Sequence, residues 1–484
     1  MQPIQNPMNY EEFIKGLIYS PLQAQSTQVR SMWNSKFIAI CLLTMMLISS
    51  SLSGCFGIDE VSQSQNQVIG ELIIFNEDGA YTWFQDERAI ISDGKIIIGS
   101  VASGNIDSNR TGDIDVVTYD LSTGITQLSE LHHNLEYDDH DSPALLVRQD
   151  GRYLAVYSTH SGKHPLSNTI HYSISTNPYD STSWEPELTF IPSNHSRVSY
   201  SNLHYLQDEN GNNGRIYNFF RGLNNSWNPS IMTSDDMGEN WDAWGLLIQH
   251  SGYRPYVKYA SDGTDTIHFI FTEGHPKIYN NSIYHAYYRG GMLYSSNGSE
   301  IRLLEDGPIQ ISEGTTVFPG GPNAVAWCND IAIDSNGHPY LAYSVQMNQD
   351  PMDHRYRYSR WNGNQWLDYE ISFAGERLYS GEDDYTGNIA LDPNNPSAVY
   401  ISTNVNPTTG APLSSGHYEI FQGRTNDDGV NWIWLPITEN STEDNIRPIV
   451  PDWDDQNTAV IWLQGTYDRY TDFNLKVVGV IISE

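Results

Sequence analysis

The stretch Tyr137–His160, YDDHDSPALLVRQDGRYLAVYSTH, carries the pattern that decides the fold. Its apolar segment 144–148 is followed by Gln-Asp-Gly at 149–151, and Asp and Gly accept the left-handed backbone that a tight turn requires. Residues 152–158 then return with alternating aromatic and small side chains. This order predicts a β-hairpin, in which two antiparallel strands are joined by a short turn.

Two histidines stand at the outer ends of the predicted hairpin. His140 precedes the first strand within Asp138-Asp139-His140-Asp141, and His160 follows the second strand. Because an antiparallel return brings the outer strand ends together, the two imidazoles should lie close to one another at one edge of a sheet. Flanking carboxylates would orient His140 or favour its charged form, although a loop histidine can also serve only as a cap or a salt-bridge partner.

The pattern of apolar strand, Asp/Asn/Gly turn and apolar strand recurs seven times, at intervals of about sixty residues. The seven copies are at 88–100, 144–158, 202–222, 256–273, 330–344, 388–403 and 449–464. Self-similarity at such a period is typical of repeat architectures, and a repeat long enough for four strands indicates a propeller. We therefore predict an all-β fold, a seven-bladed β-propeller of four-stranded blades that fills residues 70–484.

Two Asp-boxes support this prediction. Residues 234–241 (SDDMGENW) and 425–432 (TNDDGVNW) both fit Ser/Thr-x-Asp-x-Gly-x-x-Trp, and 172–184 is a looser third candidate. In such a turn the hydroxyl and carboxylate bind loop amides and Gly takes the positive-φ position. Asp-boxes are structural staples, so we assign them no chemistry.

The N-terminal region reads as a targeting segment. A basic start at 32–36 precedes the apolar run Phe37–Ile48, and Leu-Ser-Gly-Cys at 52–55 resembles a lipobox. We expect residues 1–54 to hold an upstream segment and a lipoprotein-type signal peptide, Cys55 to be lipidated, and 55–69 to be a polar tether. A plain signal or an uncleaved anchor is the alternative. The expected location is the outer face of the cell membrane, or the medium.

Charge and cysteine content restrict the class of protein. Cys41 lies within the signal and Cys55 at its end, so Cys328 is left alone and no disulfide framework is expected. The formal net charge is −34, which argues against nucleic acid as a partner. An anionic substrate would need a local basic pocket. We expect a monomer.

Further candidate residues follow the hairpin. In the run 199–205 (SYSNLHY), period two places Tyr200, Asn202 and His204 on one face. Tyr200 among polar neighbours could carry a proton, although a core tyrosine is the simpler explanation. Arg221 ends an aromatic strand, where its guanidinium could bind a carboxylate.

A third group lies between 253 and 328. Arg254 and Tyr256 precede a predicted strand, and His275, His285 and Cys328 offer ligand types that suit zinc. Their spacing matches no compact zinc motif, and a lone buried Cys often acts as a small hydrophobic residue.

These residues resemble a known family. The runs DDHDSPALLVRQDGRYLAVYSTH, YSNLHYL with RIYNFFRG, and RPYVKYASDG with HFIFTEGHP and IYHAYY are similar to the seven-bladed propeller ulvan lyases of polysaccharide lyase families 24 and 25, within the wider BNR-repeat group. The resemblance covers most of 75–460 and is densest over 137–290. It implies a secreted lyase that cleaves a sulfated, uronate-containing polysaccharide by β-elimination.

The resemblance also implies roles. Arg221 would neutralise the uronate carboxylate, and His140 and Tyr200 would serve as base and acid in an order left open. His160 would position the sugar or tune His140. Tyr205 is the alternative family tyrosine, and Tyr256, Arg254, Asn202 and Tyr205 are candidates for binding substrate. His275, His285 and Cys328 would hold a structural zinc; calcium is a second metal considered, and no organic cofactor is expected.

Two other functions compete with the lyase. A sialidase-like glycoside hydrolase also carries Asp-boxes, and Arg221, Arg254 and Arg289 could supply its arginine triad, but the converging histidines would then have no role. A non-catalytic glycan-binding propeller would keep the aromatic subsite without needing a proton carrier. The feature that separates these readings is whether His140, Tyr200 and Arg221 share one pocket.

Overall fold

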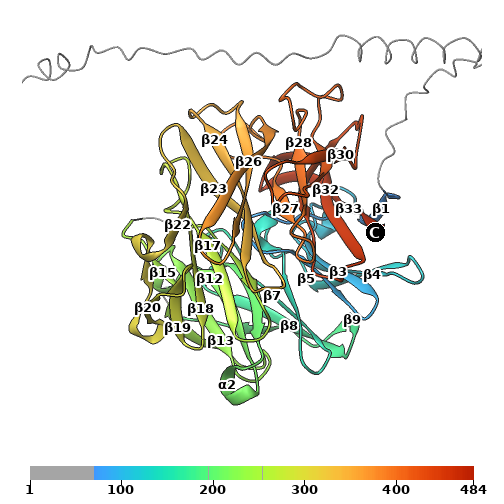
Figure 1. The fold of residues 1–484 in the computed structure, drawn as a ribbon. Coiled ribbons are helices and arrows are strands. Elements are labelled where there is room, and N and C mark those ends of the chain that lie inside the picture. Colours follow the sequence, from blue (N-terminus) through green and yellow to red (C-terminus); the bar gives the residue numbers. More distant parts are fainter. Residues whose placement is uncertain (1–69, 194–195, 253, 484) are drawn as a thin grey trace, which may run out of the picture. The chain divides into compact units, whose positions relative to one another are not determined.

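The repeated hairpins form seven antiparallel sheets in the computed structural model, which describes residues 70–193, 196–252 and 254–483. The sheets are the blades of a propeller (Figure 1), as the sequence predicted. The predicted signal peptide, the predicted lipidation site Cys55 and the predicted tether 55–69 lie outside the described residues.

The blades are numbered here in chain order. Blade 1 contains β2 (Ala89–Ser92), β3 (Lys95–Val101), β4 (Ile114–Asp120) and β5 (Thr126–His132). Blade 2 contains β6 (Ala144–Val147), β7 (Tyr153–Tyr157), β8 (Ile170–Asn177), β9 (Asp180–Trp184) and β10 (Leu188–Phe190). Blade 3 contains β11 (Ser199–Leu206), β12 (Arg215–Arg221), β13 (Pro229–Ser234) and β14 (Asp242–Leu246).

Blade 4 contains β16 (Val257–Ser261), β17 (Thr266–Phe271), β18 (Ile283–Arg289), β19 (Met292–Ser295), β20 (Glu300–Leu303) and β22 (Thr315–Phe318). Blade 5 contains β23 (Ala324–Ile333), β24 (Pro339–Met347), β25 (His354–Trp361) and β26 (Trp366–Gly375). Blade 6 contains β27 (Ile389–Leu391), β28 (Ala398–Thr403), β29 (Glu419–Arg424) and β30 (Ile433–Pro436).

Blade 7 contains β31 (Asp444–Ile449), β32 (Asn457–Arg469), β33 (Asp472–Ser483) and β1 (Ile73–Asn76). A small parallel pair joins β15 (Ile248–Gln249) to β21 (Ile309–Gln310). Helical structure in the described residues is limited to α2 (Glu209–Asn212) and the 3-10 turns η1 (Ser108–Arg110), η2 (Asp139–Asp141), η3 (Leu223–Asn225), η4 (Leu304–Asp306) and η5 (Ile311–Glu313). No helix in this part of the chain has the length and apolar character needed to cross a bilayer.

Each of the seven sequence repeats is the hairpin of a blade's first two strands. In the hairpin that opened the sequence argument, β6 pairs with β7 from Ala144 opposite Val156 to Val147 opposite Tyr153. Gly151 has φ 78° in the connecting turn. The first strands of blades 1 to 6 border a shared cavity of about 660 Å³ around the centre of the ring. The repeat therefore supplies the inner part of each blade.

Both Asp-boxes adopt the predicted turn, between the third and fourth strands of blades 3 and 6. Ser234 Oγ donates to Asp236 Oδ1 at 2.9 Å and accepts from the Gly238 amide at 2.7 Å. The second copy repeats these bonds through Thr425 at 2.9 and 3.1 Å, and Gly429 has φ 96°.

The ring closes by pairing strands from distant parts of the chain. β1 pairs antiparallel with β33, so that Ile73 lies opposite Gly479 and blade 7 combines segments from both sides of the sequence (Figure 1). Phe75 of β1 is buried in the core shared by blades 7 and 1, with its ring 5.2 Å from that of Tyr119. The sequence prediction included residues 70–87 in the propeller but assigned them to no particular blade, because the first repeat begins at 88.

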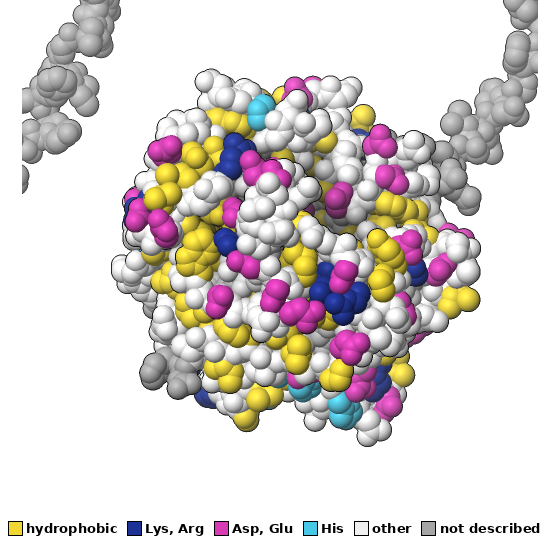
Figure 2. Space-filling view, turned by 90° about the horizontal axis from the view of Figure 1, so that it is seen from below, with side chains coloured by type: hydrophobic (Ala, Val, Ile, Leu, Met, Phe, Trp, Pro, Cys, Tyr) yellow, Lys and Arg dark blue, Asp and Glu magenta, His cyan; other side chains and the backbone are white. Residues whose placement is uncertain are grey.

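The acidic composition is visible on the surface. Asp and Glu side chains are spread over the face shown in Figure 2, with Lys and Arg gathered in few places. An anion that approaches this protein therefore needs a local group of positive charges.

Candidate active site

The hairpin of blade 2 brings His140 and His160 into contact. Their rings are stacked, with centroids 3.9 Å apart and planes at 13°. Asp138 holds both, since its two carboxylate oxygens lie 2.6 Å from His140 Nδ1 and 2.8 Å from His160 Nδ1. Both Nδ1 atoms thus point to one carboxylate, which leaves each Nε2 directed away from Asp138.

A second layer of buried charge fixes the turn that carries His140. Asp139 Oδ1 lies 2.9 Å from His140 Nδ1, and Asp139 Oδ2 pairs with Arg447 Nη1 at 2.6 Å. Tyr467 donates its hydroxyl to the same oxygen at 2.9 Å. The Arg447 guanidinium is fully buried between the rings of Trp83 and Tyr467, 4.0 Å from each centroid. Blade 7 therefore holds a residue of the turn before blade 2.

Tyr200 reaches the histidines from a bulge in blade 3. The pairing of β11 with β12 shifts between Ser199 and Asn202, and Tyr200 has φ 62°, a left-handed conformation that is unfavourable for a large side chain. Its hydroxyl lies 3.5 Å from His160 Nε2, and its ring is 5.3 Å from that of His140. Strain of this kind is retained where the surrounding structure holds a side chain in place.

Arg221 completes the cluster from the end of β12. Its guanidinium lies over the rings of Tyr200 and Tyr256, 4.6 and 4.5 Å from their centroids, and its Nη2 donates to the Pro255 carbonyl at 3.1 Å. Tyr200, Arg221 and Tyr256 line one pocket together with Phe84 and the strands around them. Arg221 has no carboxylate partner among the described residues, so its charge is available to a bound anion.

Arg254 adds a second positive charge next to this pocket. It interacts electrostatically with Tyr256 and Tyr200, and these groups together raise the pKa of Arg254. Its charge also acts with burial to lower the pKa of His275, to about 3. The pocket is therefore locally basic in a strongly acidic protein.

The histidine pair carries one proton near neutral pH. Burial lowers the pKa of His140, but the carboxylates of Asp138 and Asp139 outweigh it and raise that pKa to about 9. Burial and the neighbouring His140 charge lower the pKa of His160. Burial raises the pKa of Tyr200, so its phenol is protonated. The site thus combines an imidazolium, a neutral imidazole and a phenol within contact distance.

Other predicted site residues lie elsewhere or have structural partners. Asn202 accepts a hydrogen bond from the Asp86 amide at 2.8 Å and contacts backbone carbonyls, and His204 pairs with Asp86 at 2.9 Å. Tyr205 lies at the far end of β11, hydrogen-bonded to Gln149. Of the two candidate tyrosines, Tyr200 is the one in the pocket. Asn202 lines the same pocket as Tyr200, whereas His204 pairs with Asp86, and the bulge interrupts the strand alternation between Tyr200 and Asn202.

The predicted zinc ligands are not brought together. Among the described residues, the groups whose potential ligand atoms lie within 4.8 Å of one another do not include His275, His285 and Cys328. His285 bonds Ser296 at 2.8 Å and His268 at 3.0 Å instead. Cys328 is buried, and burial raises its pKa to about 12, which disfavours the thiolate that zinc requires. These residues do not fit a shared metal ion.

The sequence argument missed three neighbours of the histidines. They are Arg447, Phe84, whose ring stacks 5.8 Å from His140, and Tyr470, whose ring edge faces both imidazoles at 5.3 and 5.6 Å. Tyr470 stands at the tip of the β32–β33 hairpin, and its carbonyl accepts a hydrogen bond from the Asp139 amide at 3.0 Å. The signal that could have indicated this contact is the length of β32 and β33, which are the longest strands in the described residues and carry Tyr470 toward the turn before blade 2.

Fold and site together define a seven-bladed β-propeller in which a buried histidine pair contacts a tyrosine, and this tyrosine lines one pocket with an arginine. Residues 103–374 match the family model described as "BNR repeat-containing family member". The match spans more than half of the sequence, and the chain belongs to this family.

Two curated proteins are similar to parts of the chain. One is named Ulvan Lyase-PL25, from Pseudoalteromonas sp. (strain PLSV), and is 21% identical over 280 residues, which are 50% of this chain and 54% of that protein. The other is an Ulvan lyase from Alteromonas sp. (strain LOR), 30% identical over 124 residues, 22% of this chain and 24% of that protein. The matched region is thus about half or less of the length of either relative.

A solved structure supports the fold. It is described as a polysaccharide lyase PL25 ulvan lyase bound to -[GlcA(1-4)Rha3S]-, and it superposes with a TM-score of 0.60 at 16% identity, covering 84% of this chain and 95% of that one. At this level of identity the likeness concerns the fold.

Proposed function

We propose that this protein is a polysaccharide lyase that cleaves a uronate-containing polysaccharide by β-elimination. The observation that carries the proposal is a continuous set of contacts from His140 through His160 and Tyr200 to Arg221, of which Tyr200 and Arg221 line one pocket. The two similar proteins named ulvan lyases support the same class of reaction. A sulfated polymer related to ulvan is the substrate we propose to test first.

The first requirement of this reaction is to make a weakly acidic carbon release its proton. The hydrogen α to a uronate carboxylate becomes more acidic when the carboxylate charge is neutralised and the developing enolate is stabilised. Arg221 is suited to this task, since its guanidinium can form a bidentate pair with a carboxylate. Arg254 adds a second positive charge nearby.

The second requirement is a base and an acid in the correct protonation states. His160 is neutral and its Nε2 lies 3.5 Å from the Tyr200 hydroxyl, so it can accept the phenol proton as Tyr200 takes the α-proton. His140 is charged near neutral pH and can protonate the oxygen of the leaving sugar. In this assignment Tyr200 is the base and His140 the acid, and Asp138 keeps both imidazoles in position.

The first experiment measures ultraviolet absorbance during incubation with uronate polymers, beginning with ulvan. β-Elimination leaves a double bond conjugated with the carboxylate, whereas hydrolysis yields new reducing ends without that chromophore. We expect the absorbance to rise with wild-type protein, and to stay flat with His140→Ala and Arg221→Ala variants that retain the wild-type circular dichroism spectrum. Arg289→Ala is the matched control, because Arg289 is half exposed and paired with Asp265.

The competing functions give different results in the same assay. New reducing ends without the absorbance change would indicate a hydrolase of sialidase type. The required arginine triad is not assembled, since Arg289 lies at the end of β18 beside Asp265, whereas Arg221 lies over Tyr256. Polymer binding without either product would indicate a glycan-binding propeller.

The same proposal includes a place of action. A polymer too large to enter a cell must be cut outside it, which agrees with the lipobox-like sequence that ends at Cys55. We propose a lipid-anchored protein at the outer face of the membrane. Labelling with a radioactive fatty acid, lost in a Cys55→Ala variant, tests this part separately.

A further inference from the structure

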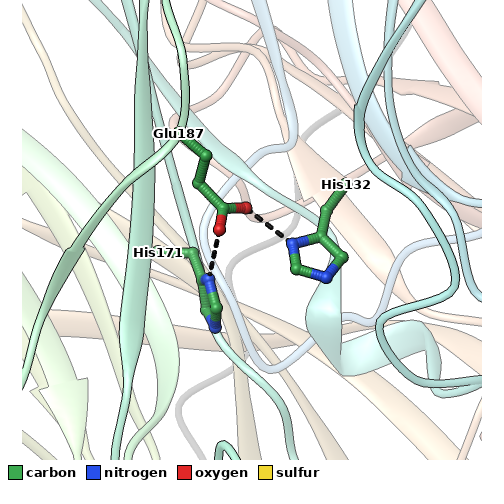
Figure 3. Close-up of side chains that lie close together, drawn as sticks. All are labelled: His132, His171 and Glu187. Atoms are coloured by element: carbon green, nitrogen blue, oxygen red, sulfur yellow. Dashed lines mark hydrogen bonds and ion pairs between the residues drawn. The ribbon is translucent and has the colours of Figure 1, made fainter.

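A second cluster of histidine and carboxylate side chains lies outside the proposed active site. It joins His132 at the end of β5 in blade 1 to His171 of β8 and to Glu187, which directly precedes β10, in blade 2 (Figure 3). The two Glu187 carboxylate oxygens lie 2.6 Å from His132 Nδ1 and 2.9 Å from His171 Nδ1.

Strand pairing explains how the cluster forms. In blade 2, His171 lies opposite Tyr157 of β7 and opposite Thr189 of β10, so the three side chains share one face of the sheet. Glu187 is two residues from Thr189 and therefore projects from the same face. Tyr157 donates its hydroxyl to Glu187 Oε2 at 2.6 Å. The last strand of the neighbouring blade supplies His132, so the cluster spans two blades.

The donor set is one that divalent zinc prefers. Two imidazole nitrogens and one carboxylate are a common set of protein ligands for zinc, with a further position filled by water or another group. The potential ligand atoms lie within 4.8 Å of one another, and in a tetrahedral zinc site with bonds of about 2.0–2.1 Å they would be about 3.3 Å apart. The hydrogen bonds seen here need to lengthen by about half an ångström to admit the ion.

The surroundings of the cluster also suit a metal ion. His171 is buried, whereas the His132 side chain is 23% exposed and leaves access for an ion and a water ligand. Burial raises the pKa of Glu187, but hydrogen bonds from His132, His171 and Tyr157 outweigh it and lower that pKa, so the carboxylate is charged. Tyr157 occupies the outer position from which hydrogen-bond donors commonly orient a ligating carboxylate.

A comparison with the two other clusters of this kind in the described residues favours this one. Asp138, His140 and His160 belong to the proposed active site. In the group of Asp113, Glu130 and His133, Asp113 already pairs with Arg110 at 3.3 Å, and His133 is largely exposed. Glu187 has no Lys or Arg partner in the described part of the chain, so the positive charge near it can come from an ion.

We propose that His132, His171 and Glu187 form a zinc site that joins blade 1 to blade 2. The site stabilises the ring where two blades meet and takes no part in the proposed elimination.

The test uses the purified full chain, freed of metal with a chelator and then supplied with ZnCl₂ or CoCl₂. Metal content, melting temperature and the visible spectrum of the cobalt form are measured for wild type, Glu187→Gln and His132→Ala. A His160→Ala background removes the active-site group as a competing ligand set. We expect one bound zinc, a melting temperature raised by several degrees, and cobalt d–d absorption between about 500 and 650 nm, all lost in both variants.

His133→Ala is the matched control, because it removes the adjacent exposed histidine and should change none of these readings. Zinc binding that is equal in wild type and Glu187→Gln would overturn the proposal. So would a wild-type protein that shows neither bound zinc nor the cobalt spectrum, since the cluster would then be a hydrogen-bonded contact between blades. If a cluster variant fails to fold, the cobalt spectrum of the His160→Ala protein decides the question, because the competing active-site group is absent from it.

Discussion

At the scale of single residues, the main feature is a pair of stacked imidazoles that share one carboxylate. Two charged rings 3.9 Å apart would repel each other, so the pair accepts its first proton readily and its second reluctantly. Asp138 contacts both rings, whereas Asp139 contacts only His140 and so favours His140 as the ring that holds that proton. The pair therefore supplies an acid and a base at the same pH.

This arrangement predicts a bell-shaped pH profile for turnover. The pKa of His140 is raised to about 9, so its acid function is present below that pH and is lost as the pH rises through about 9. The pKa of His160 is lowered, so its basic form is lost only in acid, below the ordinary histidine value of about 6.5. Initial rates of absorbance increase between pH 4 and 11 would measure both limbs.

Asp138→Asn provides the control for the alkaline limb. It removes a charge that stabilises the His140 imidazolium, so that limb should move toward lower pH. An alkaline limb unchanged in this variant would mean that another group controls it.

Substitution of Arg447, which lies outside the pocket, should have a large effect on stability. Arg447→Met leaves the buried Asp139 carboxylate with His140 as its remaining cationic neighbour, and breaking a buried pair in this way typically costs about 3–5 kcal/mol. The free energy of unfolding, measured with urea, should fall by that order. The double variant Arg447→Met/Asp139→Asn should recover part of the loss, and equal stability of the single and double variants would contradict this account.

At the scale of strands and turns, the sequence predicted those features that depend only on residues close together in the chain. Apolar alternation around an Asp/Gly turn predicted every inner hairpin, and hairpin pairing alone brought His140 to His160. The bulge at Tyr200 was not predictable in this way, because it depends on how β11 pairs with β12 and on neighbours from other blades. The zinc prediction failed because spacing along the chain does not tell which strand faces carry His275, His285 and Cys328.

The Asp-box turns allow a test of backbone conformation. Gly429 has φ 96°, and a Cβ there would lie 2.7 Å from the ring of Tyr358. Gly429→Ala should therefore cost about 2–4 kcal/mol, from left-handed strain and from displacement of a buried ring. Urea unfolding of the purified variant would measure the loss.

Gly416→Ala separates the two contributions. Gly416 also has a positive φ, 72°, but a Cβ there meets nothing within 4 Å. The Gly416→Ala variant should therefore lose only the free energy of unfolding that corresponds to left-handed backbone strain, about 1 kcal/mol. Equal losses at Gly416 and Gly429 would show that contact with Tyr358 contributes nothing.

At the scale of the whole molecule, the sequence predicted the number of blades but not how the ring is joined. The contact of β1 with β33 and that of Arg447 with Asp139 link residues more than three hundred positions apart. Such contacts leave no periodic signal, because each depends on the geometry of the closed ring. The same holds for His132, which meets Glu187 only because blades 1 and 2 pack against each other.

Because β1 closes the ring, removal of one buried side chain from this strand should lower the stability of the fold substantially. Phe75→Ala removes a buried ring from the core between blades 7 and 1 and should cost about 3–5 kcal/mol. Ile74→Ala is the matched control in the same strand, because Ile74 is 42% exposed and should lose less than about 1 kcal/mol. Thermal unfolding of both variants would show the difference, and similar melting temperatures would argue that β1 is dispensable.

The contacts between blade 7 and Asp139 have a consequence for biosynthesis. Arg447, Tyr467 and Tyr470 all follow His140, Tyr200 and Arg221 by more than two hundred positions, so a nascent chain contains these three residues long before it can hold them in place. A chain released before residue 447 would carry the reactive side chains without the partners that order them. Under the proposed function, catalytic competence is thus tied to completion of the ring, and prematurely terminated products should be inert.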